Sequence, residues 1–120
     1  RINSKGKKSF KYLKIEASIK LPKTNGGLWP AFWMMGDNDK EWPACGEIDI
    51  MEIALTDKVA GKTVQELDMR KRFGLNIIAV KQNGRLTTEI LPTTVLSAAD
   101  SLTVIGKTEA IHRFEKDLQS

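Results

Sequence analysis

The chain has 120 residues, enough for one small domain or two very small ones. Apolar residues make up 41% and charged residues 28%, an ordinary balance for a soluble globular protein, and no apolar run approaches the ~20 residues of a membrane-spanning helix. The net charge of +4 is weak support for a nucleic-acid partner, because surplus lysine usually forms a solvated surface. We therefore expect no DNA or RNA partner and no direct insertion into a membrane.

The first fifty residues have the pattern of short β-strands. Residues 10–21 alternate polar and apolar side chains, as a strand with one buried face does. The apolar face is formed by Leu13, Ile15, Ala17, Ile19 and Leu21. The sequence then predicts a turn at residues 24–27, an aromatic and methionine-rich segment at 28–36, and a further strand at 47–51.

A helix is predicted after residue 63. Thr63 and Glu66 fit a capping box, and Gly74 is well placed to end the helix. The side chains expected to face inward are Val64, Leu67 and Phe73.

Three strands and a second helix are predicted in the remainder. The strands cover residues 75–81, 85–91 and 101–106, and Asn83-Gly84 is a strong hairpin signal between the first two. Residues 107–118 have helical periodicity, with an apolar stripe of Ile111, Phe114 and Leu118.

Three carboxylates follow one another closely at Glu47, Asp49 and Glu52. On a regular strand Glu52 points away from the other two, and a β-bulge would bring it back to their side. Glu47 and Glu52 could then lie ~5–5.5 Å apart, as a retaining glycosidase requires, with Asp49 separating their pKa values. Alternating charges on a strand are more often a solvated face, and that alternative stays open.

Three tryptophans accompany these carboxylates. Trp29, Trp33 and Trp42 offer flat apolar faces for sugar rings, although a segment such as residues 28–36 is more often a wedge in a core.

The segments "GLWPAFWMMGD" and "WPACGEIDIME" closely resemble glycoside hydrolase family 16, the laminarinases and related β-glucanases, and the resemblance covers residues 1–52. It implies a retaining endo-β-glucanase in which Glu47 is the nucleophile, Asp49 assists and Glu52 is the acid/base. Two departures are Leu13 in place of the usual glycine and Ser18 in place of the usual arginine. Because such a jelly roll needs ~200–250 residues, we expect the motif to be idle and the chain not to be an enzyme.

Residues 51–120 resemble the RCK C-terminal domain, also called TrkA-C, of Ktr/Trk potassium-transporter regulatory subunits. The resemblance is carried by "GKTVQELDMRKRFGLNIIAV" and by the segment from Pro92 to Gly106. It implies a small α+β domain with helices on one face of a sheet, a homodimer, a cytoplasmic location and a cyclic di-AMP site at the dimer interface.

The carried-over ligand contacts are polar at Arg70 and Asn76 and lining at Leu75, Ile77 and Pro92. An arginine suits a phosphate and an asparagine can bind a base edge. The alternative is that Arg70 is a helix-surface residue and Asn76 caps a strand. No metal site or cofactor is expected, because His112 is the single histidine and fits an exposed helix position, while Cys45 fits a small buried residue.

The two resemblances meet at Met51-Glu52, which indicates a recombined chimera with one segment at residues 1–50 and another at 51–120. The strand at residues 47–55 is expected to serve as the first strand of the TrkA-C-like sheet, with the upstream β-hairpin added to its edge. This arrangement would bury Ile15, Ile19, Trp29 and Trp33. Three functions remain open: a cyclic dinucleotide-binding dimer module, a β-glucan hydrolase remnant from a secreted family, and a structural chimera without activity.

Overall fold

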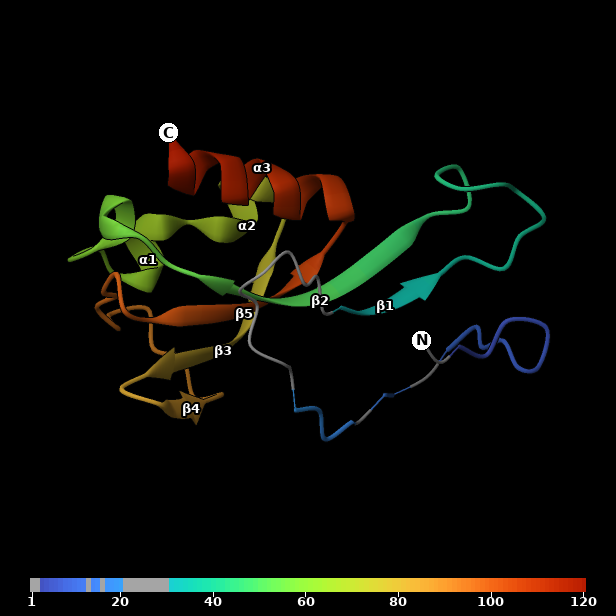
Figure 1. Ribbon diagram of the computed structural model, residues 1–120, viewed down its shortest axis with the longest axis horizontal. Coiled ribbons are helices and arrows are strands. Elements are labelled where there is room, and N and C mark those ends of the chain that lie inside the picture. The colour runs from blue at the N-terminus through green and yellow to red at the C-terminus, as the bar shows by residue number, and fades with distance from the viewer. Residues whose placement is uncertain (1–2, 13, 16, 21–30) are drawn as a thin grey trace.

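The computed structural model describes residues 3–12, 14–15, 17–20 and 31–120 (Figure 1). The elements in chain order are β1 (Phe32–Met35), β2 (Glu47–Ala54), a 3-10 turn η1 (Asp57–Val59), α1 (Val64–Leu67), α2 (Met69–Phe73), β3 (Asn76–Gln82), β4 (Arg85–Thr87), β5 (Ser101–Gly106) and α3 (Thr108–Gln119).

The strands form one antiparallel sheet in the order β1-β2-β5-β3-β4, and α2 and α3 lie on one of its faces (Figure 1). The predicted α+β architecture, with helices on one face and strands added from the N-terminal segment, is confirmed. Strand β2 pairs with β1 on one side and β5 on the other, so both segments of the sequence share it. The boundary between residues 50 and 51 lies inside this strand, and the division into two domains stays a prediction.

The core lies between the sheet and the helices. Met51 and Ile53 of β2 project toward the helices together with their neighbours Val104 and Leu102 of β5, because directly paired residues share a face. The predicted stripe on α3 is confirmed, since Ile111, Phe114 and Leu118 are all buried. The Phe73 and Phe114 rings pack at 5.1 Å between centroids with a 60° tilt, which joins α2 to α3.

The predicted helix over residues 63–74 is broken into α1 and α2. Its start is as expected: Glu66 N–H donates to Thr63 Oγ1 (3.2 Å), and Thr63 N–H donates to Glu66 Oε2 (2.8 Å). The bond from Thr63 N–H, followed by a second that Thr63 Oγ1 donates to Glu66 Oε2 (2.8 Å), holds the pKa of the Glu66 carboxyl below its usual value. The break falls at Asp68, whose φ of 45° is left-handed, a conformation that aspartate tolerates better than most residues. Gly74 ends α2 at φ 76°, as predicted.

Strand β4 is shorter than the predicted strand at residues 85–91. The Asn83-Gly84 turn forms as expected, with both residues at positive φ, but β4 ends at Thr87. The chain beyond it runs back past α1, where the carbonyls of Pro92 and Thr94 accept hydrogen bonds from Gln65 and Val64. Its backbone is therefore satisfied by α1 instead of by β3.

The predicted strand at residues 10–21 is wrong over its described part. Residues 10–12, 14–15 and 17–20 contain no strand, and Ile15 (42% exposed) and Ile19 (49% exposed) are not buried. A strand needs a neighbour for its N–H and C=O groups, and the outer edge of β2 is already taken by β1. Leu13, Glu16, Leu21 and Trp29 lie outside the described residues.

Candidate functional site

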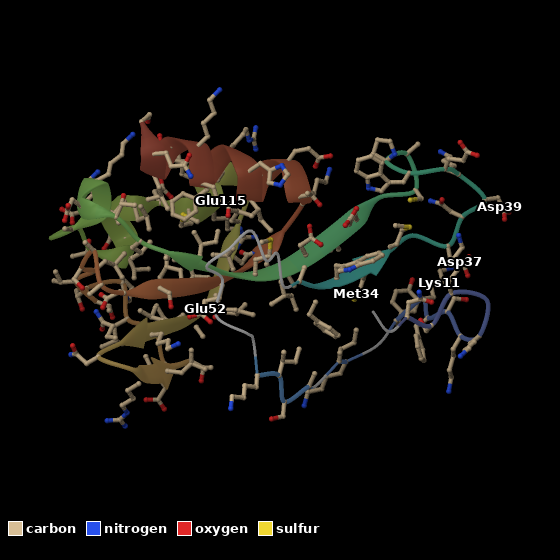
Figure 2. The ribbon with its side chains drawn as sticks, viewed as in Figure 1. Lys11, Met34, Asp37, Asp39, Glu52 and Glu115 are labelled. Atoms are coloured by element: carbon tan, nitrogen blue, oxygen red, sulfur yellow. The ribbon has the colours of Figure 1, made fainter. Side chains whose placement is uncertain are left out.

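The three carboxylates of β2 do not share one face of the sheet. The pairing with β5 runs without interruption from Asp49↔Gly106 to Ala54↔Ser101, so β2 has no bulge. Glu47 and Asp49 consequently project to the helix-covered face and Glu52 to the opposite face (Glu52 is labelled in Figure 2). The bulge that the glycosidase arrangement needs is absent from this strand, and the sheet separates Glu47 from Glu52.

Each carboxylate accepts a hydrogen bond from a different element. Trp42 Nε1 donates to Glu47 Oε2 (2.5 Å), and Thr108 Oγ1 of α3 donates to Asp49 Oδ2 (2.5 Å). Asp49 is only 4% exposed, so its carboxylate joins β2 to the start of α3 out of contact with solvent.

Glu52 accepts from one residue of β5, the neighbouring strand, and from one of β3, the strand beyond it. Ser101 Oγ of β5 donates to Glu52 Oε1 (2.6 Å), and Lys81 Nζ of β3 lies 3.4 Å from the same oxygen. These contacts resemble a structural cross-strand network and tie the third carboxylate to strands outside the N-terminal segment.

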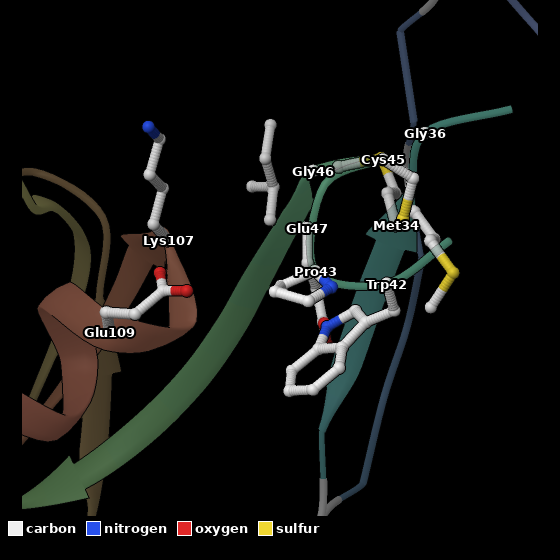
Figure 3. Close-up of a pocket in the computed structure, with 11 residues that line it drawn as sticks. Met34, Gly36, Trp42, Pro43, Cys45, Gly46, Glu47, Lys107 and Glu109 are labelled. Carbon is white, nitrogen blue, oxygen red and sulfur yellow. The ribbon is translucent and has the colours of Figure 1, made fainter. Parts of the chain in front are cut away.

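Glu47 lies at an open hollow of about 610 Å³ beside the β1–β2 hairpin (Figure 3). Trp42 is 60% exposed there, and its bond to Glu47 fixes the plane of its ring. Lys107 and Glu109 from the start of α3 line the other side, so both segments of the chain build this hollow. Of the other tryptophans, Trp33 is half-buried on β1, on the face shared with Asp49, and it does not line the hollow.

The residues of the second predicted site lie on the two sides of the Gly74 turn. Arg70 is exposed on α2, and Asn76 is exposed as the first residue of β3. Ile77 is half-buried and packs against the core, and the Leu75 side chain is fully buried. Pro92 is exposed in the segment beside α1. Arg70, Asn76 and Pro92 are thus exposed, while the Leu75 side chain belongs to the core.

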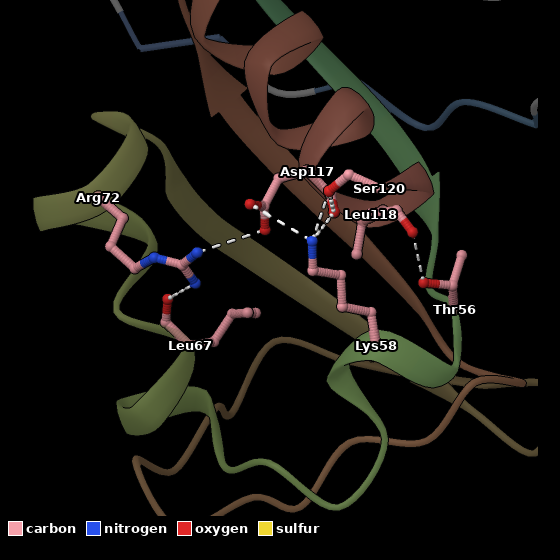
Figure 4. A network of polar contacts seen from close by, with 7 residues as sticks. All are labelled: Thr56, Lys58, Leu67, Arg72, Asp117, Leu118 and Ser120. Atoms are coloured by element: carbon pink, nitrogen blue, oxygen red, sulfur yellow. Dashed lines mark hydrogen bonds and ion pairs between the residues drawn. The ribbon is translucent and has the colours of Figure 1, made fainter.

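A polar network that sequence reasoning missed joins η1, α2 and α3 (Figure 4). Asp117 of α3 pairs with Arg72 of α2 (3.3 Å) and with Lys58 of η1 (3.7 Å). Arg72 also donates to the Leu67 carbonyl (3.4 Å). These residues are far apart in sequence and carry no motif, so only the fold brings them together.

The remaining candidate residues are Cys45 and His112. Cys45 is buried and His112 is exposed on α3, as predicted. Glu115 of α3 (labelled in Figure 2) is partly buried, and this burial raises the pKa of its carboxyl group.

Within the described residues, no cluster of His, Cys, Asp or Glu side chains could hold a metal ion. None of the described helices has the length and apolar character needed to cross a bilayer.

Known proteins match the chain in two overlapping stretches. The TrkA-C domain family model matches residues 50–119, and the model for the XgeA-like, catalytic GH16 domain matches residues 1–83. The two matches overlap within residues 50–83, which contain most of β2 and all of α1, α2 and β3.

Individual relatives divide in the same way. Ktr system potassium uptake protein C of Bacillus subtilis is 39% identical over 70 residues, covering 58% of this chain and 32% of that protein. Glucan endo-1,3-beta-glucosidase A1 of Niallia circulans is 46% identical over 54 residues, covering 43% of this chain and 8% of that protein. The chain thus spans a third or less of these curated relatives.

Solved structures match the helix-bearing part of the chain. The RCK C domain of the potassium transport protein KtrA, in complex with cyclic di-AMP, is 37% identical with a TM-score of 0.55, covering 57% of this chain and 80% of that one. The RCK_C domain dimer of S. agalactiae BusR with cyclic di-AMP is 21% identical, with a TM-score of 0.54, and covers 58% of this chain and 95% of that one. The second likeness shows the fold alone.

BusR is also solved with its busAB-promotor DNA, again at 21% identity. The expected lack of a nucleic-acid partner therefore stays a prediction.

The two sequence resemblances are confirmed: the chain belongs to the TrkA-C domain family through residues 50–119 and to the XgeA-like, catalytic GH16 domain family through residues 1–83.

Proposed function

We propose that the chain is a regulatory module that dimerises, binds cyclic di-AMP and acts in the cytoplasm in the control of potassium transport. The likeness to the KtrA RCK C domain, solved with this ligand, carries the proposal because it spans 80% of that domain at 37% identity. The homodimer is proposed from the TrkA-C resemblance, since the ligand site that this resemblance implies needs two subunits.

The side chains around the Gly74 turn support the same ligand. The Arg70 guanidinium is exposed and offers a fork of donors to a phosphate. The Asn76 amide is exposed and offers both a donor and an acceptor to the edge of a purine. A cyclic dinucleotide presents both kinds of group at once.

Titration calorimetry with cyclic di-AMP tests this proposal. Arg70→Ala should weaken binding about tenfold or more, because a charged hydrogen bond contributes about 1.5–3 kcal/mol. Arg85→Ala is the matched control, since Arg85 is an exposed arginine that pairs with Gln82, at the end of β3 remote from Asn76. Sedimentation should show a dimer in the presence of ligand. Binding that is absent in the unsubstituted chain, or equal in both variants, contradicts the proposed site.

A second candidate function is β-glucan binding without hydrolysis at the hollow beside Trp42. The observation that favours it is the exposed Trp42 ring, fixed by Glu47 over an open hollow with charged side chains at its rim. The absence of a bulge in β2, which places Glu47 and Glu52 on opposite faces, argues against turnover. Gel retardation in laminarin should be lost in Trp42→Ala and retained in Trp33→Phe, with no reducing sugar released by any form. Release of sugar that Glu47→Gln abolishes would instead establish the retaining hydrolase.

A further inference from the structure

The first twenty residues carry the positive charge of this chain. They contain seven lysine or arginine residues and one acidic residue, whereas the other hundred residues contain twelve basic and fourteen acidic ones. The segment is therefore strongly cationic, and the rest of the chain is slightly anionic. Like charges in one block repel one another, and a surface of the opposite charge relieves that repulsion, so such blocks are often interaction segments.

The lysines of this segment are presented to solvent. All six of them are exposed: Lys5, Lys7, Lys8, Lys11, Lys14 and Lys20. A turn gathers the first three, because the N–H groups of residues 7 and 8 both donate to the Ser4 carbonyl oxygen (2.9 and 3.2 Å) and Gly6 has a φ of 71°. The described part of residues 3–20 contains no acidic residue, so its surface is uniformly cationic.

Exposed apolar side chains lie between these lysines in the sequence. Phe10 and Tyr12 are 58% and 89% exposed, and Ile15 and Ile19 are exposed as well. One lysine ammonium group lies 5.5 Å from the Phe10 ring centroid and another lies 5.9 Å from that of Tyr12. Positive charge and apolar surface are therefore adjacent in this segment.

We propose that residues 3–20 bind the surface of a bilayer that contains anionic lipids. The lysines lie at the headgroup phosphates, and the aromatic and isoleucine side chains lie at the boundary with the acyl chains. The inference goes beyond the proposed function and needs neither the cyclic di-AMP site nor the hollow beside Trp42. Lysine is a flexible point charge, which suits mobile headgroups because it requires no fixed partner geometry. Aromatic side chains favour the membrane–water interface.

The isoleucines favour a lipid surface over a nucleic acid. A nucleic acid rewards positive charge and flat rings on which its bases stack. Ile15 and Ile19 have no flat ring, and their aliphatic side chains gain most where acyl chains replace water. The described part of the segment lies on the side of the sheet away from α3 (Figure 1), so a bilayer can contact it without displacing the helices from the core.

Co-sedimentation with lipid vesicles tests the proposal on the unsubstituted chain. The chain should bind vesicles of phosphatidylcholine mixed with phosphatidylglycerol, and it should not bind vesicles of phosphatidylcholine alone. Added salt should release it, because the screening length falls from about 10 Å at 0.1 M to about 3 Å at 1 M. Equal binding to both kinds of vesicle, or binding to neither, overturns the inference.

Lysine substitutions locate the contact. Each lysine near an anionic surface strengthens binding about fivefold, so Lys5→Gln, Lys7→Gln and Lys8→Gln combined in one chain should weaken it about 100-fold. The matched control removes the same charge by glutamine substitution at three exposed lysines outside the segment: Lys62, Lys71 and Lys116. The control should retain most of the binding. If both triple variants weaken binding equally, only net charge matters and the inference is overturned.

Two further measurements separate a lipid surface from other polyanions. Ile15→Ser and Ile19→Ser should each weaken vesicle binding about threefold to tenfold through loss of an apolar contact. Retention of the chain by a DNA duplex but not by anionic vesicles would assign the segment to nucleic acid and overturn the inference. The described positions of the segment contain no strand, so these substitutions leave the sheet intact. A chain that binds vesicles but not cyclic di-AMP overturns the proposed function alone.

Discussion

The hydrogen bond between Asp49 and Thr108 should stabilise the fold across the join between the two matched segments. Thr108 Oγ1 lies 2.5 Å from Asp49 Oδ2, and the two residues are 59 positions apart. Asp49 is 4% exposed, so replacing Thr108 by valine leaves a buried carboxylate without this donor. A hydrogen bond to a charged group contributes about 1.5–3 kcal/mol, and an unsatisfied buried group costs a similar amount.

A double-mutant cycle of Asp49→Ala and Thr108→Val measures this contribution. Urea unfolding followed by far-UV circular dichroism should give a coupling free energy of about 1.5–3 kcal/mol between the two sites. Thr103→Val is the matched control, because Thr103 lies on β5 but projects to the face opposite the helices. It should show no coupling to Asp49→Ala.

The cycle also tests whether Asp49 has a structural role. A coupling below about 0.5 kcal/mol is what independent sites show, and it would refute the reasoning that Asp49 holds α3 to β2. A large coupling would show that Asp49, the assisting aspartate that the GH16 resemblance implies, stabilises the packing of α3 on β2.

Four further outcomes are expected. Gly36→Ala places a Cβ against the Cys45 carbonyl oxygen and should remove hydrogen-exchange protection from β1, while the unfolding of the helix-bearing core persists. Thr63→Ala should cost about 0.5–2 kcal/mol in urea unfolding through loss of the cap, and retention of full stability would contradict the capping box. Because the pKa of Glu66 is lowered in the folded state, Glu66→Gln should destabilise the chain at pH 7, and the difference should vanish as pH falls below about 4.5. Because the pKa of Glu115 is raised, Glu115→Gln should increase the thermal midpoint at pH 7, a gain that shrinks on acidification; a decrease at pH 7 would oppose this.

Local signals predicted the helix-bearing part of the fold well. The capping box, the Asn83-Gly84 turn and the buried stripe on α3 all form, because each depends on residues within a few positions of one another. The break at Asp68 was not predicted. Leu67 and Met69 lie two positions apart, and both are buried only because the chain turns between α1 and α2.

Features that depend on a partner strand could not be predicted in the same way. Alternation at residues 10–21 indicates a strand, but it does not supply the neighbouring strand that a sheet requires, and the described positions contain no strand. The prediction that Glu52 shares a face with Glu47 and Asp49 likewise required a β-bulge. The unbroken pairing of β2 with β5 contains none. For the ligand site, the sequence predicts contacts at Arg70 and Asn76, which are both exposed, whereas the burial of Leu75 follows only from the fold.

The shared strand β2 is tested most directly by backbone cross-strand nuclear Overhauser effects in the labelled chain. Contacts should appear on both sides of β2, between Phe32 and Ile50 and between Ile50 and Ile105, as one continuous five-stranded sheet requires. Contacts to Ile105 without contacts to Phe32 would contradict it, because the N-terminal segment would then lie apart from the sheet.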